Sequence, residues 1–106
     1  MSDEIQTILA EAQKALAQSN PAISAKLLSD ILKLDACHRD ANYYLAIIHR
    51  QAGQPEQALK HLSEILRIDP RDATASQEKG FSEMAINQPS EALVSFRRAV
   101  TLNDSL

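Results

Sequence analysis

The chain has 106 residues, of which 44% are hydrophobic and 24% are charged, with a formal net charge of −3 at pH 7. This length is typical of one domain, so we expect residues 1–106 to fold as a single unit. The slightly negative charge argues against nucleic-acid binding, because nucleic-acid-binding surfaces are strongly basic. The start of the chain is acidic and no apolar run approaches the ~20 residues of a membrane span, so we expect neither a signal peptide nor a membrane contact. The single cysteine, Cys37, excludes an internal disulfide and favours a reducing, cytoplasmic location.

The sequence repeats with a period of about 34 residues, which is the signature of a repeat architecture. Pro21, Pro55 and Pro89 are spaced by this interval. The same shift aligns small residues with small and large with large, at Ala12, Ala46 and Gly80, at Ala58 and Ala92, and at Leu28, Leu62 and Phe96. So many matching columns predict three copies of one unit, over residues 5–38, 39–72 and 73–106.

Each unit is predicted to contain two helices joined by a short turn. Apolar residues recur at intervals of three and four, as in Leu59, Leu62 and Leu66, and no alternating pattern of a β-strand competes. Proline at the first helical position lacks an N–H that would have no partner there. Asp40 and Asp72 are the predicted N-caps of the third and fifth helices. In chain order, the predicted helices are 4–18, 21–34, 40–52, 55–68, 73–86 and 89–102.

A helix–turn–helix unit of about 34 residues resembles the tetratricopeptide repeat. The residues that match the family pattern are Ile8, Ala12 and Leu28 in the first unit, Leu45, Ala46, Ala58, Leu62 and Pro70 in the second, and Gly80, Ala92 and Phe96 in the third. The chain departs from the pattern where the family has an aromatic residue late in the first helix, at Ala15, His49 and Glu83. The resemblance implies an all-α solenoid of three units and six helices, whose first helices line a concave groove.

The resemblance also implies a function, the binding of a protein or peptide in this groove. The predicted groove residues are Leu9, Gln13, Tyr43, Ile47, Arg50, Gln51, Gln77, Phe81 and Met84. Aromatic side chains and arginine are enriched in the binding hot spots of protein interfaces, and methionine adapts to varied partners. The alternative is that some of these side chains, Ile47 and Phe81 in particular, fill the core between helices.

One branch of the family grips the terminal carboxylate of chaperone tails with basic and asparagine side chains. The corresponding positions hold Leu9, Gln13, Tyr44, Thr74 and Glu78, none of which is Lys, Arg or Asn. The sequence therefore favours an extended or helical peptide that is bound through apolar pockets.

Candidates for catalysis or metal binding are weak. Cys37 and His38 are the only adjacent Cys/His pair, while His49 and His61 lie far apart in the sequence, in different predicted helices. A structural metal site needs about four ligands, and a nucleophile needs a positioned base. We predict no catalytic residue, no metal and no cofactor, and therefore no enzymatic activity of this chain alone.

Two further hypotheses concern the last predicted helix, where Leu93 and Val100 flank Arg97. Terminal repeats need a polar outer face, so a following helix or a second copy could cover this surface. The pattern is also similar to the N-terminal repeat regions of bacterial sulfotransferases and glycosyltransferases. The chain could then be such a region of a longer enzyme, where it would orient the catalytic domain or its acceptor, or it could form a homodimer.

Overall fold

The structure is a computed structural model that describes residues 2–104. Within this range the chain forms six helices and no strand, and each predicted boundary lies within two residues of the observed one. The helices are α1 Ser2–Ala17, α2 Pro21–Leu34, α3 Arg39–Gln51, α4 Pro55–Ile68, α5 Ala73–Ala85 and α6 Pro89–Asp104. The predicted all-α class is confirmed. No helix among the described residues has the length and hydropathy needed to cross a membrane.

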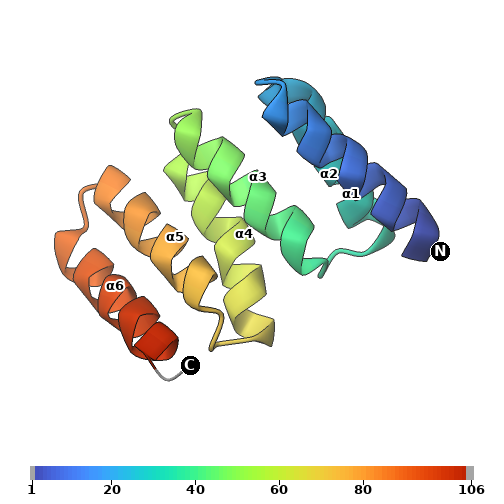
Figure 1. The fold of residues 1–106 in the computed structure, drawn as a ribbon. Helices are drawn as coiled ribbons and strands as arrows, with labels where there is room; N and C mark the ends of the chain where they lie inside the picture. Colours follow the sequence, from blue (N-terminus) through green and yellow to red (C-terminus); the bar gives the residue numbers. More distant parts are fainter. Residues whose placement is uncertain (1, 105–106) are drawn as a thin grey trace.

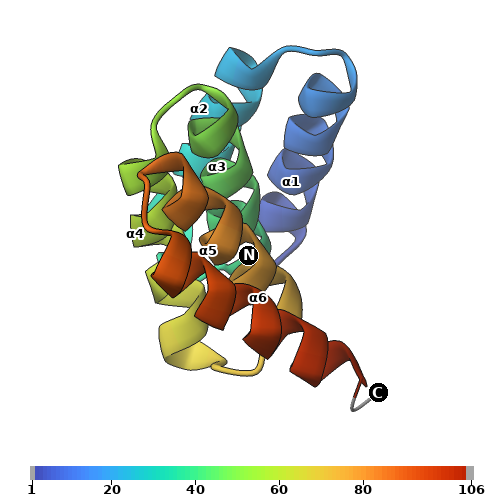
Figure 2. The same cartoon turned by 90° about the vertical axis from the view of Figure 1, so that its left-hand side faces the viewer.

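The helices pair into three hairpins, α1–α2, α3–α4 and α5–α6, which follow one another across the molecule (Figure 1). Successive hairpins are joined by contacts of α2 with α3 and of α4 with α5, and α3 also touches α5. Figure 2 looks onto the last hairpin and shows α6 inclined to α1, so that the hairpins twist along the stack. Contacts that run mainly between neighbouring units are the defining property of a solenoid.

Each hairpin turns at a residue in the left-handed region of backbone space. These residues are Ser19, Gly53 and Asn87, with φ of 58°, 79° and 62°, and they are spaced by the repeat period. The next N–H closes the turn by donating to a carbonyl earlier in the chain, from Asn20 to Ala15, from Gln54 to His49 and from Gln88 to Glu83, at 2.8–2.9 Å. This is the Schellman arrangement that ends many helices. Only one of the three units places the preferred glycine there.

Ser19→Gly is expected to stabilise the protein by about 1 kcal/mol, because a left-handed conformation costs a residue with a Cβ about 1–2 kcal/mol. The matched variant Gly53→Ser is expected to lose a similar amount, since a Cβ at Gly53 would meet no atom within 4 Å and only its φ is strained. Thermal unfolding checks both. Equal melting temperatures for the two variants would contradict this interpretation.

The two helices of each hairpin approach closely where a small residue faces a large one. Ala12, Ala46, Ala58 and Ala92 are buried, and Leu28 and Leu62 are completely so. In the last hairpin the contact is tighter still, because a Cβ added to Gly80 would lie only 2.5 Å from Cε1 of Phe96. The Phe96 ring therefore occupies the space that an alanine side chain takes in the first two units.

Gly80→Ala is expected to lower the free energy of unfolding by ~1–3 kcal/mol, because the Phe96 ring must move out of its packed position. The double variant Gly80→Ala/Phe96→Leu recreates the Ala–Leu combination of the first two units. It should be more stable than Gly80→Ala alone, as measured by urea unfolding. A second substitution that only adds to the loss would refute the steric explanation.

The N-caps of α3 and α5 are spaced by one repeat period, although the two residues differ. Asp72 caps α5 as predicted, and its carboxylate accepts from the N–H of Ala75 at 3.1 Å. The prediction of Asp40 as the cap of α3 is wrong. The cap is His38, whose Nδ1 accepts from the N–H of Ala41 at 3.1 Å. His38 lies one full period before Asp72, whereas the matching Arg-Asp-Ala triplets are spaced more closely than one period.

Candidate functional site

The first helices of the three hairpins, α1, α3 and α5, form a surface that we call the first-helix face. The predicted groove residues divide into three groups on it. The exposed residues are Gln13, Gln51, Gln77, Phe81 and Met84, while Tyr43, Ile47 and Arg50 are half-buried and Leu9 is buried. The half-buried and exposed groups supply a mixed apolar and amide surface.

Leu9 does not belong to the open surface, contrary to the prediction. Its side chain is only 7% exposed and packs in the core with Leu28, Ala41 and Leu45. α1 therefore turns Leu9 toward α3, where it joins the first two hairpins. The face keeps Gln13 as its α1 residue.

Arg39, at the start of α3, links the second hairpin to the third. Its Nε and Nη2 donate to the two carboxylate oxygens of Asp72, at 2.8 and 3.0 Å, and Nη2 also donates to the hydroxyl of Thr74. Nη1 donates to Asp40 at 3.0 Å. The hydrogen bonds to Asp72 raise the pKa of Arg39 above its ordinary value. Burial opposes ionisation of Asp72, yet the hydrogen bonds from Arg39 and from the Ala75 N–H lower its pKa. Both groups are therefore ionised, and Arg39 fixes α3 against the cap of α5.

Arg50, near the end of α3, makes the second link. Its Nε and Nη2 lie 3.3 and 3.1 Å from Oε1 of Glu78, a buried carboxylate of α5. The guanidinium also lies over the Phe81 ring, at 5.4 Å from the centroid. Removal of Arg50 would leave Glu78 buried without its partner, which is costly. Arg50 is thus a structural residue at the edge of the face.

The aromatic side chains of the face are held in place by neighbouring side chains. The guanidinium of Arg39 lies 4.4 Å from the centroid of the Tyr43 ring, and the Tyr44 hydroxyl accepts from the Gln13 side chain at 3.1 Å. Burial, followed by the nearby Glu78, raises the pKa of Tyr43, so its hydroxyl stays neutral. Phe81 packs edge-on against Phe96 at 5.2 Å between centroids and still leaves 42% of its surface exposed. Phe81 therefore serves the core and the surface together.

The result is a face with little free charge. Both of its arginines are paired with carboxylates, and the amide groups of Gln13, Gln51 and Gln77 supply its neutral polar groups. Arg50 was predicted from the sequence as a binding residue, whereas no role was predicted for Arg39. The signal was present, because Arg39 and Asp72 are separated by close to one period and stand at the starts of successive first helices.

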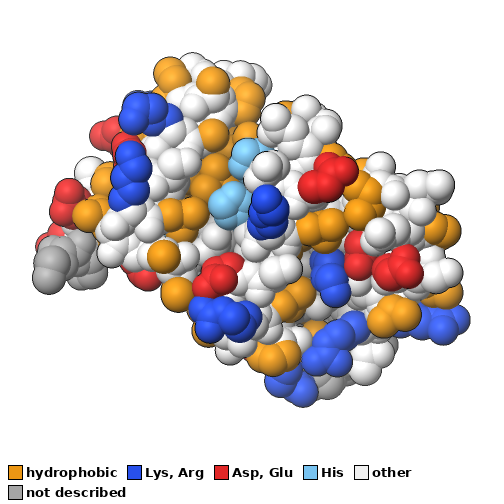
Figure 3. Space-filling model, turned by 180° about the vertical axis from the view of Figure 1, so that it is seen from behind, with side chains coloured by type: hydrophobic (Ala, Val, Ile, Leu, Met, Phe, Trp, Pro, Cys, Tyr) orange, Lys and Arg blue, Asp and Glu red, His pale blue; other side chains and the backbone are white. Residues whose placement is uncertain are grey.

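His49 and His61, which are far apart in the sequence, lie side by side in the structure. The rings of His49 and His61 are stacked with centroids 5.4 Å apart and planes within 6°. Each Nδ1 bonds an amide oxygen, of Gln54 at 2.8 Å and of Asn42 at 3.0 Å. Histidine side chains reach the surface beside hydrophobic ones in the view from behind (Figure 3). Across residues 2–104, no three side chains of His, Cys, Asp or Glu are grouped so that they could hold a metal ion.

The stacked histidines make stability depend on pH. Burial, and then the neighbouring His49, lower the pKa of His61 below its ordinary value of 6.5. The unfolded chain therefore takes up this proton first, so the stabilisation is complete above about pH 6.5 and is lost as the pH falls below it.

We expect the melting temperature to fall between about pH 7.5 and about pH 5.5, the range in which histidines titrate. His61→Gln, which cannot take up the proton, should show a shallower fall over the same range. His49→Gln, which removes the neighbouring charge, serves as the companion variant. A fall in His61→Gln as steep as in the unaltered protein would contradict the assignment.

Comparisons with known proteins agree on the architecture. A family model described as Tetratricopeptide repeat matches residues 9–73. No curated protein matches the chain significantly. The first TPR of Spaghetti (RPAP3), solved bound to the HSP90 peptide SRMEEVD, is 12% identical with a TM-score of 0.92, over 100% of this chain and 84% of that one.

The chain is also similar to parts of two longer proteins of known structure. The crystal structure of MamA is 17% identical with a TM-score of 0.87, over 95% of this chain and 59% of that one. A mutant O-GlcNAc transferase of Thermobaculum terrenum is 21% identical with a TM-score of 0.91, over 95% of this chain and 19% of that one. The chain thus spans less than two thirds of MamA and about a fifth of the transferase. At these identities the likeness shows the fold.

Proposed function

The chain belongs to the tetratricopeptide repeat family, and we propose that it is a protein-interaction module whose first-helix face binds an extended or helical peptide of a partner protein. The observation that carries the proposal is the exposure of Phe81, Met84 and Gln77 on one side of α5, beside Tyr43 of α3. Aromatic and methionine side chains next to amides match the composition of protein interfaces. The binding of an HSP90 peptide by the RPAP3 repeat supports this use of the fold.

The charge on the face defines the peptide that we expect. Arg39 and Arg50 are each engaged by a carboxylate of α5 or its cap, so neither offers an unpaired positive charge to a partner. Apolar contacts and amide hydrogen bonds from Gln13, Gln51 and Gln77 would then supply the binding energy. We propose a largely uncharged peptide segment with aliphatic or aromatic anchors.

Peptides selected on the protein from a random display library should therefore be rich in aliphatic and aromatic residues. Gln77→Ala/Met84→Ala is expected to weaken such a peptide about tenfold in a titration, because hot-spot truncations cost more than ~1 kcal/mol. Its melting curve should stay near that of the unaltered protein, since both side chains are exposed. The control is Ile23→Ala, an exposed hydrophobic side chain of α2. An equal loss in the control would contradict the proposal.

The peptide SRMEEVD tests the proposal from the other side, because we expect it not to bind. The places that would bind its terminal carboxylate hold a buried Leu9, a Gln13 and a Tyr44 that are hydrogen-bonded to each other, a Thr74 that is hydrogen-bonded to Asp72, and an ion-paired Glu78. Isothermal titration calorimetry should therefore detect no binding. Binding that disappears when the peptide is amidated at its C-terminus would show that the protein does grip a carboxylate.

We further propose that α6 is covered by a second copy of the chain. Leu93 and Val100 are about half exposed or more. The opposite end of the stack differs, because Thr7, Glu11 and Lys14 are exposed at the positions where the second unit buries Ala41, Leu45 and Ile48. This favours pairing of two like apolar ends over head-to-tail stacking. Static light scattering should give a dimer whose mass falls on dilution and in Leu93→Lys/Val100→Lys. A monomer at every concentration would remove the proposal.

A second candidate function is that of a repeat region within a longer transferase, where it would orient the catalytic domain or its acceptor. The likeness to part of the T. terrenum O-GlcNAc transferase supports it, and so does the apolar surface of α6. The coding sequence after Leu106 tests it, since a transferase would require several hundred further codons. In both candidates the repeats themselves are non-catalytic. The cytoplasmic location expected from the single cysteine stays a prediction.

A further inference from the structure

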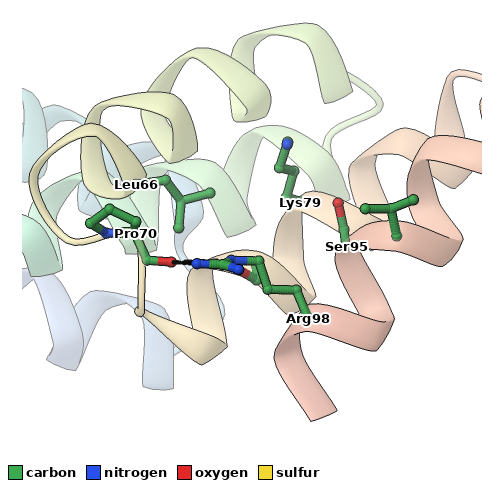
Figure 4. A pocket seen from close by; sticks show the side chains of 7 residues that line it. Leu66, Pro70, Lys79, Ser95 and Arg98 are labelled. Atoms are coloured by element: carbon green, nitrogen blue, oxygen red, sulfur yellow. Dashed lines mark hydrogen bonds between the residues drawn. The ribbon is translucent and has the colours of Figure 1, made fainter. Parts of the chain in front are cut away.

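A cleft of about 220 Å³ opens between α4 and α6, away from the peptide-binding face proposed above. Leu66 and Val94 form its apolar walls, Ser76 and Ser95 are the small polar residues between them, and Lys79 and Arg98 bring positive charge. Figure 4 shows Arg98 reaching from α6 to the carbonyl of Pro70, in the turn that follows α4. The volume is below the ~300–1,000 Å³ of small-molecule sites and suits one large side chain.

The equivalent place one repeat earlier, at the junction of the first and second hairpins, explains why this space is open. At that junction, the positions of Ser76, Lys79 and Ser95 are occupied by Asn42, Leu45 and His61. There, the His61 ring is hydrogen-bonded to the Asn42 side chain at 3.0 Å, and Leu45 is buried. Large side chains thus fill the earlier junction, where the later one has two serines and a lysine. The cleft is a consequence of these three differences between repeats.

The charges around the cleft differ between the junctions as well. Arg98 replaces Glu64 of the preceding unit and donates to a neutral carbonyl, through Nε at 3.3 Å and Nη2 at 3.1 Å. Among residues 2–104, Arg98 makes no ion pair within 4.0 Å. Lys79 lies 4.0 Å from Glu83, and that carboxylate also accepts from the Ser95 hydroxyl at 2.6 Å. The cleft therefore keeps a net positive charge next to an apolar wall, and Val94 leaves 67% of its surface exposed.

We infer that this cleft binds an acidic segment of a protein partner, with a hydrophobic side chain inserted between Leu66 and Val94 and an adjacent carboxylate on Arg98. Charge complementarity selects this occupant, because hydrogen bonds between arginine and carboxylate are among the strongest in proteins. The same carboxylate would find no free arginine on the first-helix face. The two surfaces therefore select different partners, a largely uncharged peptide on the first-helix face and an acidic one in the cleft.

The probe for this inference is the peptide acetyl-Glu-Phe-Glu-amide, titrated into the ¹⁵N-labelled protein. We expect saturable shifts of the backbone amides of Leu66, Lys79 and Val94. The peptides acetyl-Gln-Phe-Gln-amide and acetyl-Glu-Ala-Glu-amide should bind at least about tenfold more weakly, since the first lacks the carboxylates and the second the inserted side chain. Equal binding of the three peptides would overturn the inference.

Three variants and one matched control locate the site. Arg98→Gln should weaken the acidic peptide about tenfold, whereas Arg97→Gln, which removes an equal charge from the same helix, should not. Ser76→Asn places the side chain of the preceding junction in the cleft and should abolish the shifts. If that variant does not fold, Val94→Asn, at an exposed position, removes the apolar wall instead and adds no charge. Unweakened shifts in Arg98→Gln, Ser76→Asn or the Val94 variant, or shifts that appear at Tyr43 and Gln77, would assign the peptide elsewhere and refute the inference.

Discussion

The close approach of the two helices within each hairpin is the constraint on which the rest of the structure depends. Ala12 and Ala46 have almost no exposed surface, and Gly80 lies so close to Phe96 that no Cβ fits between them. Small side chains allow the helix backbones to pack at short range, and interiors packed to this density tolerate neither voids nor added atoms. Each hairpin thereby becomes a rigid block that can stack on the next. The first-helix face and the α4–α6 cleft both depend on how these blocks meet.

The hairpins are joined by two different kinds of interaction. Apolar side chains such as Leu9, Leu45 and Leu66 fill the space between successive units. Along the first helices, Arg39 with Asp72 and Arg50 with Glu78 bridge α3 to α5 and its cap. Ion pairs at partly buried positions gain from good geometry and from extra hydrogen bonds, and Arg39 has both. Their use in holding the units together leaves both arginines of the first-helix face without free charge, which is why we propose a largely uncharged peptide for it.

Repetition of the fold did not repeat the chemistry of the surface. The junction that contains Asn42 and His61 is filled, while its counterpart with Ser76 and Ser95 is hollow. α5 also buries Glu78 and Glu83, each with a hydrogen-bonded partner on a neighbouring helix. A solenoid accepts such differences because each unit contacts only its neighbours. The α4–α6 cleft is thus a local property of one junction, and the other junction shows the same place filled.

The sequence by itself determined the architecture. The regular spacing of Pro21, Pro55 and Pro89 fixed six helices to within two residues, because helix starts, turns and apolar stripes are local features of the chain. Local patterns also misled, since the similar triplets at Arg39 and Arg71 concealed that His38 caps α3. Only the tertiary structure decided which side chains face outward. Leu9 lies in the core, Arg50 is paired with Glu78 and His49 stacks on His61, because burial and pairing depend on the angle at which separate helices meet, and helical spacing within one segment does not contain that angle.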